Sequence, residues 1–322
     1  MELRNFWWLL IWLFTGGYLL NNYVPKETII ISGKKEKRWT LRAAIALVLP
    51  YIIWAGFRWD YIDTGSYRQF FLEAPRQISE WGQYIESLTK DEGFYIITLL
   101  MKYVLGNSDV LYFLIIAAVQ ILCIVFVCRQ YSSDYWLSIF LFVASTDYMS
   151  WTWNGMRQFL AVTIVFATTP LILKKDYIKV ILIILFASTI HGTALLMIPI
   201  VFIMQGKSWN SKTVLCIIFS ILALTYVDQF TNILDTMLVD TQYTNVVSDW
   251  QSWNDDGMNP IRVLVYSIPT ILSLVGIKYI RNADEPIINL ATNAGIIATG
   301  LAIIAMGTSG IHMGRLPIYV SL

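Results

Sequence analysis

Charged side chains are scarce in this sequence of 322 residues, making up 14% of it against 57% hydrophobic residues. A long soluble domain does not have such a composition, because its surface requires many more polar residues. Apolar runs near the length of about 20 residues that spans a bilayer recur from end to end. The composition therefore excludes a soluble enzyme and predicts an all-α polytopic membrane protein.

Cysteine and histidine are also rare, with three and two residues respectively. Cys123, Cys128 and Cys216 all lie inside apolar runs, so we interpret them as small hydrophobic residues rather than disulfides or metal ligands. The sequence lacks a His/Cys cluster with metal spacing, a glycine-rich phosphate loop and a Gly-x-Ser-x-Gly motif. It also lacks the mixed basic and aromatic stretches of nucleic-acid surfaces. We therefore expect no cofactor and no nucleic-acid partner.

The N-terminal apolar run, from Phe6 to about Val24, lacks a small-residue cleavage site, so it predicts a first transmembrane helix rather than a signal peptide. The next segment, from Lys26 to Arg42, has the densest basic cluster of the chain. Basic loops stay in the cytoplasm, so the following run, from Leu41 to Phe57, leads outward. A polar external loop is expected over about residues 58–92.

The short apolar run Phe94–Leu105 decides the rest of the topology, because it is too short for an ordinary span. If it crosses the membrane, four later basic loops face outward. If it is re-entrant or lies in the interface, all four return to the cytoplasm, and the positive-inside rule favours this second arrangement. The other predicted spans are Val110–Val127, Tyr135–Met149, Gly155–Leu173, Tyr177–Ile190, Gly192–Met204, Thr213–Val227, Ile261–Ile280 and Ile287–Met306.

These runs predict a single transmembrane domain over residues 1–322, with about ten to twelve transmembrane helices, some of them short or re-entrant. A second external loop, over about residues 229–260, holds five aspartates and no lysine or arginine. The sequence stops at Leu322 inside a fresh apolar run, so a further helix is expected beyond it.

Three arginines, Arg58, Arg157 and Arg315, are expected at helix ends on the outer face, where the positive-inside rule disfavours them. An arginine at membrane depth costs about 2.5–3.5 kcal/mol on insertion scales, so it usually has an anionic partner. Asn154, Arg157 and Gln158 fall within about one helical turn and can reach one ligand. The planar guanidinium suits phosphate oxygens. The alternative for Arg157 is an interfacial arginine whose charge reaches the membrane surface beside tryptophans.

Carboxylates and a histidine are expected on the same outer face. Asp60, Asp63 and Glu92 are candidates for a general base or for orienting an arginine, and His191 can do either. Simpler explanations also stand: Arg58 pairs with Asp60 or Asp63, and His191 bonds a backbone carbonyl at the tip of a helical hairpin.

Several short motifs resemble those of the EpsG family. They are Arg58 at a helix end, Asp63 followed by Tyr67, the run Glu92-Gly93-Phe94-Tyr95, the run Asn154-Gly155-Met156-Arg157-Gln158-Phe159-Leu160-Ala161, and the run His191-Gly192-Thr193-Ala194-Leu195-Leu196. The likeness extends from about Phe57 to Pro199 and, more weakly, to Arg315-Leu316-Pro317-Ile318-Tyr319. The family often has a glycine before the first-loop aspartate, where this sequence has Ile62. Either Asp60 or Asp63 is therefore the counterpart.

The resemblance implies a Wzy-type polymerase of bacterial exopolysaccharide, capsule or O-antigen, with an architecture similar to the C-type glycosyltransferases. Such an enzyme is expected in the bacterial cytoplasmic (inner) membrane, with its active site on the extracytoplasmic face. Its donor and acceptor would be undecaprenyl-pyrophosphate-linked glycans, and its protein partners a chain-length regulator and a flippase. No metal is required if arginines carry the pyrophosphate.

The resemblance, together with the outer-face residues, also sets the expected roles. The catalytic candidates are Asp60, Asp63, His191 and Glu92. The residues expected to bind pyrophosphate or sugar are Arg58, Asn154, Arg157, Gln158, Arg315, Tyr67 and Tyr319. Arg157 and Arg315 would meet the charge of the pyrophosphate in an inverting displacement, and the choice of base between Asp63 and His191 stays open.

Two other functional classes are consistent with the same residues. A lipid-linked oligosaccharide flippase also needs arginines for pyrophosphate, but along a central cavity that opens to both sides. An O-antigen-ligase-like glycosyltransferase would share the arginines and the aspartate and differ in its acceptor.

Overall fold

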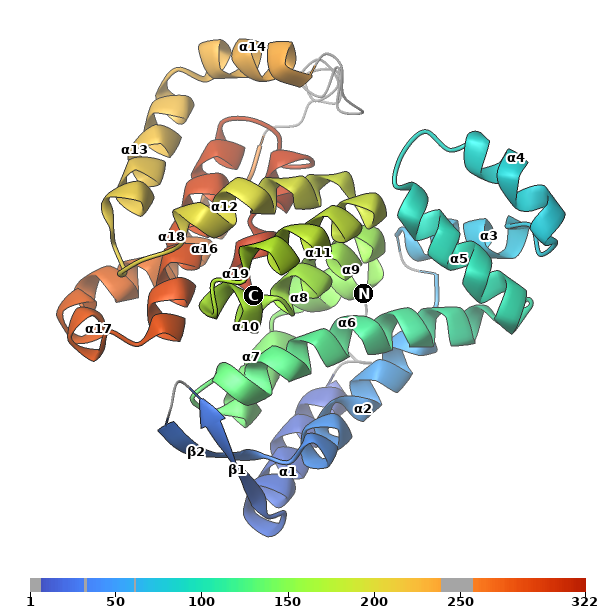
Figure 1. Ribbon diagram of the computed structural model, residues 1–322, viewed down its shortest axis with the longest axis horizontal. Helices are drawn as coiled ribbons and strands as arrows, with labels where there is room; N and C mark the ends of the chain where they lie inside the picture. Colours follow the sequence, from blue (N-terminus) through green and yellow to red (C-terminus); the bar gives the residue numbers. More distant parts are fainter. Residues whose placement is uncertain (1–6, 32–33, 61, 239–256) are drawn as a thin grey trace. The chain divides into compact units, whose positions relative to one another are not determined.

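The computed structural model describes residues 7–31, 34–60, 62–238 and 257–322 (Figure 1). By its internal contacts the chain divides into two compact units, Met1–Gly192 and Thr193–Leu322, and each is described by itself. The single transmembrane domain expected over residues 1–322 stays a prediction.

The first unit consists of helices and, among its described residues, one β-hairpin formed by β1 (Lys26–Ile31) and β2 (Lys34–Trp39). Its helices are α1 (Trp7–Tyr23), α2 (Leu41–Gly56), α3 (Thr64–Glu73), α4 (Trp81–Glu86), α5 (Glu92–Leu105), α6 (Asp109–Tyr131), α7 (Tyr135–Ala144), α8 (Thr146–Trp153), α9 (Met156–Phe166), α10 (Thr169–Leu173) and α11 (Tyr177–Ile190). Polar residues mark several helix starts: Thr40 caps α2 and Asp134 caps α7 through their side-chain oxygens. Such caps satisfy backbone N–H groups that an apolar helix leaves open.

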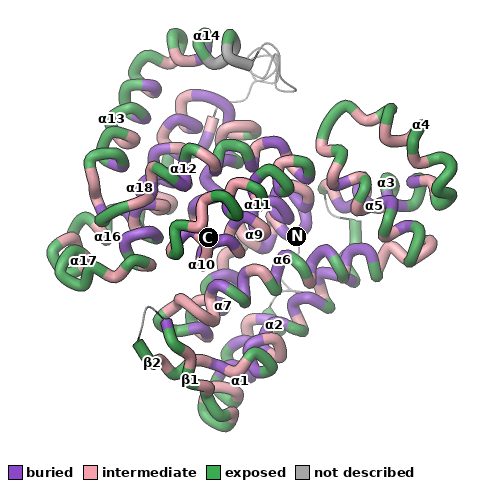
Figure 2. Tube along the Cα trace, in the orientation of Figure 1, coloured by how far each residue is buried: buried purple, intermediate pink, exposed green. Residues whose placement is uncertain are grey.

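The core of the first unit lies where α6 packs against α2 and α9, and where α9 packs against α11. Buried residues concentrate along these helices (Figure 2). Aromatic side chains fill this core, and Tyr51, Phe113 and Phe159 are at most 1% exposed. Phe71 of α3 stacks on Tyr112 of α6 with the ring centroids 4.4 Å apart. The short helix α3 is thereby fixed to the same core.

The second unit is also helical. Its helices are α12 (Met197–Ile203), α13 (Ser211–Thr225), α14 (Val227–Leu238), α16 (Pro260–Val275), α17 (Ile277–Ala283), α18 (Pro286–Met306) and α19 (Ile318–Ser321), with the short 3-10 helices η3 (Gly192–Leu196) and η4 (Met313–Arg315). The long helix α18 packs against α13 and α16. Ala302 and Ala305 of α18 form a buried cluster with Met258 and Val263. The small side chains of α18 thus allow the segment that contains Met258 and Val263 to pack closely against this helix.

Two buried asparagines of α18 hold the connection between α12 and α13. Asn293 donates to three backbone carbonyls of this connection at 3.0–3.3 Å and accepts the N–H of Trp209 at 3.2 Å. Asn289 accepts the N–H of Ser208 at 2.9 Å. Unpaired backbone groups are costly in an apolar interior, so these side chains allow a non-helical path there.

Replacing Asn293 by alanine is expected to lower the free energy of unfolding by about 1–3 kcal/mol, because buried backbone groups would lose their partner. Thermal unfolding of the purified protein in detergent measures this effect. The exposed Asn282 on α17 offers a matched control, and Asn282→Ala is expected to unfold at the wild-type temperature. An Asn293→Ala protein as stable as wild type would contradict the role assigned to this side chain.

The predicted class, an all-α polytopic membrane protein, is confirmed. Among the described residues three helical segments are long and apolar enough to cross a membrane, namely α6, Met156–Leu173 and α18. Counting each of two bent helix pairs as one span gives up to five, and α2, α7 and α11 are among the shorter apolar helices. Apolar residues such as Ile115 and Phe126 of α6 are exposed, as lipid-facing side chains would be.

Four segments differ in detail from the expectations. The basic segment after the first span is a β-hairpin, and the external loop expected at about 58–92 contains α3, the 3-10 turn Ile78–Glu80 and α4. The expected span Tyr135–Met149 ends at Ala144, because Ser145 has an extended backbone. The loop expected at 229–260 begins within α14, and residues 239–256 lie outside the described part.

Candidate functional site

Arg157 lies in the first turn of α9, directly after the turn at Asn154 and Gly155 that ends α8. Two groups from the start of α5 hold its guanidinium: Nη1 lies 3.1 Å from the Asp91 carboxylate and donates to the Tyr95 hydroxyl at 3.4 Å. The side chain is still 22% exposed. Its buried Nε has no hydrogen-bond partner among the described residues. Arg157 is therefore fixed in place, while about a fifth of its side-chain surface stays accessible to a further anion.

Asp91 joins the ends of three helices at this point. One oxygen of its carboxylate pairs with Arg157 of α9, and the other accepts the backbone N–H of Gly192, just beyond α11, at 3.2 Å. The side chain is only 5% exposed. The Asp91 backbone, which precedes α5, is left-handed at φ 57° and ψ 35°, a conformation that costs energy in a non-glycine residue. Both contacts thus fix a buried carboxylate against Arg157.

Gly93 allows α5 to approach α11 closely enough for these contacts. A Cβ at this position would lie 2.1 Å from Thr189 Oγ1 and 2.9 Å from the Thr189 carbonyl carbon. Any larger residue would force the two helices apart, because close-packed interiors have no room for an added carbon. The glycine therefore supports the position of Asp91.

Asp63 and Tyr67 of the α3 region border the same place. Tyr67 is 8% exposed, and burial raises its pKa, while Arg157 lowers it and Asp63 raises it. Both charged groups therefore lie close to the Tyr67 phenol. The backbone N–H of Asp63 donates to Asn154 at 3.1 Å, which ties the start of α3 to the turn before α9.

The Asp63 carboxylate neither caps α3 nor forms an ion pair with a described residue. We call Asp63, Tyr67, Asp91, Tyr95 and Arg157 the Arg157 cluster. It combines a partly exposed guanidinium, one carboxylate that neutralises it, and a second carboxylate that forms no ion pair with a described residue.

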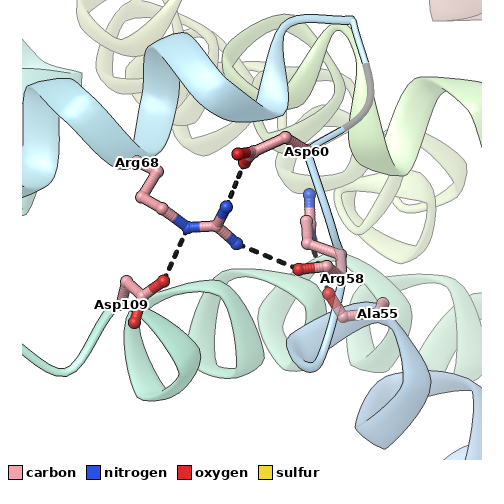
Figure 3. A network of polar contacts seen from close by, with 5 residues as sticks. All are labelled: Ala55, Arg58, Asp60, Arg68 and Asp109. Carbon is pink, nitrogen blue, oxygen red and sulfur yellow. Dashed lines mark hydrogen bonds and ion pairs between the residues drawn. The ribbon is translucent and has the colours of Figure 1, made fainter.

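Arg58 and Arg68 form a different network (Figure 3). Arg68 pairs with Asp109 at 2.6 Å and with Asp60, and donates to the Arg58 carbonyl at 3.0 Å. Arg58 itself is 3% exposed and donates to a carbonyl of its own helix end and to that of Thr152. Its guanidinium also lies over an aromatic ring of α6. Arg58 thus bonds backbone carbonyl groups and does not pair with Asp60 or Asp63.

The predicted site residues fall into separate groups. Asn154, Arg157, Asp63 and Tyr67 come together, and His191 directly precedes Gly192, which binds Asp91. Asp60 belongs to the Arg68 network, Glu92 is exposed, and Gln158 is 3% exposed. His191 has an extended backbone and donates its N–H to the carbonyl of Ala187 at 3.0 Å.

Arg315 and Tyr319 belong to the second unit. Arg315 ends η4 and is exposed, whereas Tyr319 is 6% exposed and its hydroxyl lies 3.1 Å from Thr193 Oγ1. The roles expected for both residues stay predictions.

Sequence reasoning missed Asp91 and gave Tyr95 no role. Tyr95 lies in the quoted run Glu92-Gly93-Phe94-Tyr95, one helical turn after Asp91, so the signal for a shared face was present. Asp91 stands beside Glu92, and the choice between two adjacent carboxylates depends on a left-handed backbone that sequence does not reveal. In the described part of the chain, no group of three or more His, Cys, Asp or Glu is arranged to hold a metal ion.

Comparison with known proteins gives one finding. The model of the EpsG family matches residues 41–322, which includes every residue of the Arg157 cluster and the Arg68 network. No curated protein and no solved structure matches the chain.

Proposed function

The chain belongs to the EpsG family, and from this premise we propose that it is a membrane glycosyltransferase that polymerises lipid-linked oligosaccharide repeat units. Family membership makes it a multi-pass membrane protein of the polysaccharide-polymerase type. The finer proposal is that undecaprenyl-pyrophosphate-linked units serve as donor and acceptor on the extracytoplasmic face of the bacterial cytoplasmic membrane. The observation that carries it is Arg157, fixed by Asp91 and Tyr95 with part of its side chain still exposed.

The arginine would act on the leaving group. In the proposed step, a hydroxyl oxygen of the acceptor sugar attacks the anomeric carbon of the donor, and the bond from that carbon to the pyrophosphate oxygen breaks. The electron pair leaves with the lipid pyrophosphate, whose added negative charge Arg157 stabilises. Preorganised donors aimed at developing charge are worth most in sites that exclude water. The role expected for Arg315 from the sequence, binding pyrophosphate, is kept as a separate proposal.

A base must take the proton of the attacking hydroxyl, and we propose Asp63 for this task. Its carboxylate is outside any ion pair with a described residue and close to Tyr67, whereas the Asp60 carboxylate pairs with Arg68. His191 is the second candidate, because it directly precedes the N–H group that binds Asp91. Attack from the face opposite the pyrophosphate gives inversion and needs no covalent enzyme intermediate.

The other predicted residues take positioning roles in this proposal. Arg58 would fix the segment before Asn154 through its bond to the carbonyl of Thr152. Asn154 would hold Asp63 through the backbone N–H that it accepts. Glu92 is kept as a proposed catalytic residue that orients the site, and Gln158, Tyr67 and Tyr319 as proposed substrate contacts. A chain-length regulator and a flippase are kept as proposed partners.

The test is a gel of the products that purified, reconstituted protein forms from lipid-linked repeat units. A ladder of products, with one lipid pyrophosphate released for each new linkage, supports polymerisation. A single transfer to a different acceptor would instead support a ligase. Movement of a fluorescent lipid-linked unit across the vesicle membrane without any new linkage would support a flippase and overturn the proposal.

Asp91 is proposed as a positioning residue, because its carboxylate holds the Arg157 guanidinium in place and is not itself assigned a contact with the substrate. Asp91→Asn removes the negative charge and keeps one acceptor oxygen, which can serve Gly192 or Arg157 but not both as the two carboxylate oxygens do. We expect kcat to fall about tenfold, the effect of a misplaced arginine, while KM does not rise because an anion meets a less neutralised guanidinium. Steady-state polymerisation kinetics measure both constants. Unchanged kcat in a folded Asp91→Asn protein would remove Asp91 from the mechanism.

A further inference from the structure

The β-hairpin that joins α1 to α2 has two chemically different faces. Its register pairs Lys26 with Trp39, Thr28 with Lys37 and Ile30 with Lys35. Directly paired residues of antiparallel strands project from the same face, and side chains alternate along each strand. We call Lys26, Thr28, Ile30, Lys35 and Lys37 the lysine face; Trp39, at its base, projects from the same side but is only 6% exposed. All five are exposed, Ile30 at 70%, and none is acidic.

The opposite face carries both acidic residues of the hairpin, and each is neutralised. Glu27 pairs with Arg129 at the end of α6, and Glu36 pairs with Arg38. Arg38 also donates to the carbonyl of Ser132 at 2.7 Å. These contacts attach the face opposite the lysines to the first unit, and Trp39 attaches the base of the hairpin by packing on Tyr135 with the ring centroids 5.4 Å apart. Lys26, Lys35 and Lys37 form no ion pair with a described residue, so the lysine face presents three exposed positive charges.

The hairpin lies between α1 and α2 in the chain, and this position limits how far it can extend from their ends. Lys26 follows the end of α1 at Tyr23 by three residues, and α2 begins at Leu41, two residues after Trp39. Such linkers reach at most about 10 Å. The headgroup layer on each side of a bilayer is roughly 5–8 Å thick. If α1 and α2 cross the membrane, the base of the hairpin must lie within or next to that layer.

We propose that the lysine face binds anionic lipid headgroups, with Ile30 entering the interface between the lysines. Lysine ammonium groups attract the phosphates of acidic lipids, and their aliphatic stems lie along apolar surface. An exposed isoleucine flanked by such stems suits an interface better than bulk water. The hairpin precedes the residues that the family model matches, 41–322, so this surface is a feature of this chain outside the matched region. The proposal is independent of the proposed enzymatic activity.

Hydrogen exchange of the hairpin amides in lipid nanodiscs tests the proposal locally. Nanodiscs of phosphatidylcholine alone are compared with nanodiscs that also contain phosphatidylglycerol. We expect exchange in residues 26–39 to slow by about fivefold for each lysine that engages an acidic headgroup. Salt of about 1 M, which screens exposed charges beyond about 3 Å, is expected to reverse the effect in the wild-type protein.

The variant Lys26→Gln/Lys35→Gln/Lys37→Gln is expected to lose the slowing by phosphatidylglycerol. The control Lys174→Gln/Lys175→Gln/Lys278→Gln removes the same charge from exposed lysines elsewhere and is expected to keep it. Equal exchange of the wild-type protein in both nanodiscs, or full slowing in the first variant, would overturn the proposal. Equal slowing by soluble glycerol phosphate would identify a free anion instead of a lipid surface and would also overturn it. The salt arm uses wild-type protein, so the test stands even if the triple variant fails to fold.

Discussion

Replacing Arg157 by alanine is expected to lower the rate of polymer formation by about 10²–10³-fold, the usual effect of removing a preorganised donor to developing charge. The physical reason is that Arg157 is the guanidinium of the cluster, held by Asp91 and Tyr95 with its side chain partly exposed. The rate is measured from product ladders of reconstituted protein at saturating lipid-linked substrate. Arg157→Lys keeps the charge but loses the planar fork of donors, so an intermediate loss is expected.

The exposed Arg76, which follows α3, provides the matched control. Arg76→Ala removes one positive charge from the segment expected outside the membrane, and polymer formation is expected to stay at the wild-type rate. A wild-type ladder from Arg157→Ala would return Arg157 to the simpler interpretation, an interfacial arginine that snorkels to the membrane surface. A thermal melt of each variant separates loss of chemistry from loss of folded protein, since Asp91 loses its partner in Arg157→Ala.

Asp63→Asn is expected to have an effect of similar or larger size, because a general base contributes about 10²–10⁴-fold to a rate. The amide keeps the size of the side chain and the backbone N–H bond to Asn154, so the fold should be unaffected. What is lost is the ability to take the proton of the attacking hydroxyl. Single-turnover formation of one new linkage from two lipid-linked units measures this step directly.

Asp60→Asn tests the neighbouring carboxylate with the same chemical change. Asp60 is largely exposed and pairs with Arg68, which keeps Asp109 as a second partner. Exposed ion pairs contribute about 0–1 kcal/mol, so the rate should change little. If Asp63→Asn stays active while His191→Ala loses activity by this factor, then His191 rather than Asp63 is the base.

The apolar segments could be located from the sequence with good accuracy. The run Tyr177–Ile190 coincides with α11 in full, and Leu41–Phe57 differs from α2 by one residue. A span is an apolar run bounded by polar residues, so it can be recognised from consecutive residues of the sequence alone. The break at Ser145 and the β-hairpin were not predicted, because hydropathy reports the surroundings of a segment and not its backbone conformation.

The candidate site was predictable only where its parts are local in sequence. Asn154 and Arg157 stand within one turn, so their association follows from helical spacing. Asp91 reaches Arg157 from another helix, through a left-handed backbone and the close contact of Gly93 with Thr189. Neither condition has a local pattern in the sequence. The burial of Arg58 was likewise missed. The sequence around an arginine at a helix end does not reveal whether the guanidinium binds a ligand or backbone carbonyls.

The lengths of the apolar helices in the first unit bear on the thickness of the surrounding membrane. At about 1.5 Å per residue, the 16 residues of α2 reach roughly 24 Å, against about 30 Å of hydrocarbon in an ordinary bilayer. The 14 residues of α11 reach still less. Lipids next to such helices compress or tilt their acyl chains, at a cost that grows with each ångström of mismatch. The 23 residues of α6 reach about 35 Å, so the apolar belt is expected to vary in height around the first unit. Acyl-chain length thus becomes a variable of the protein's environment, with thinner lipid favoured beside α2 and α11.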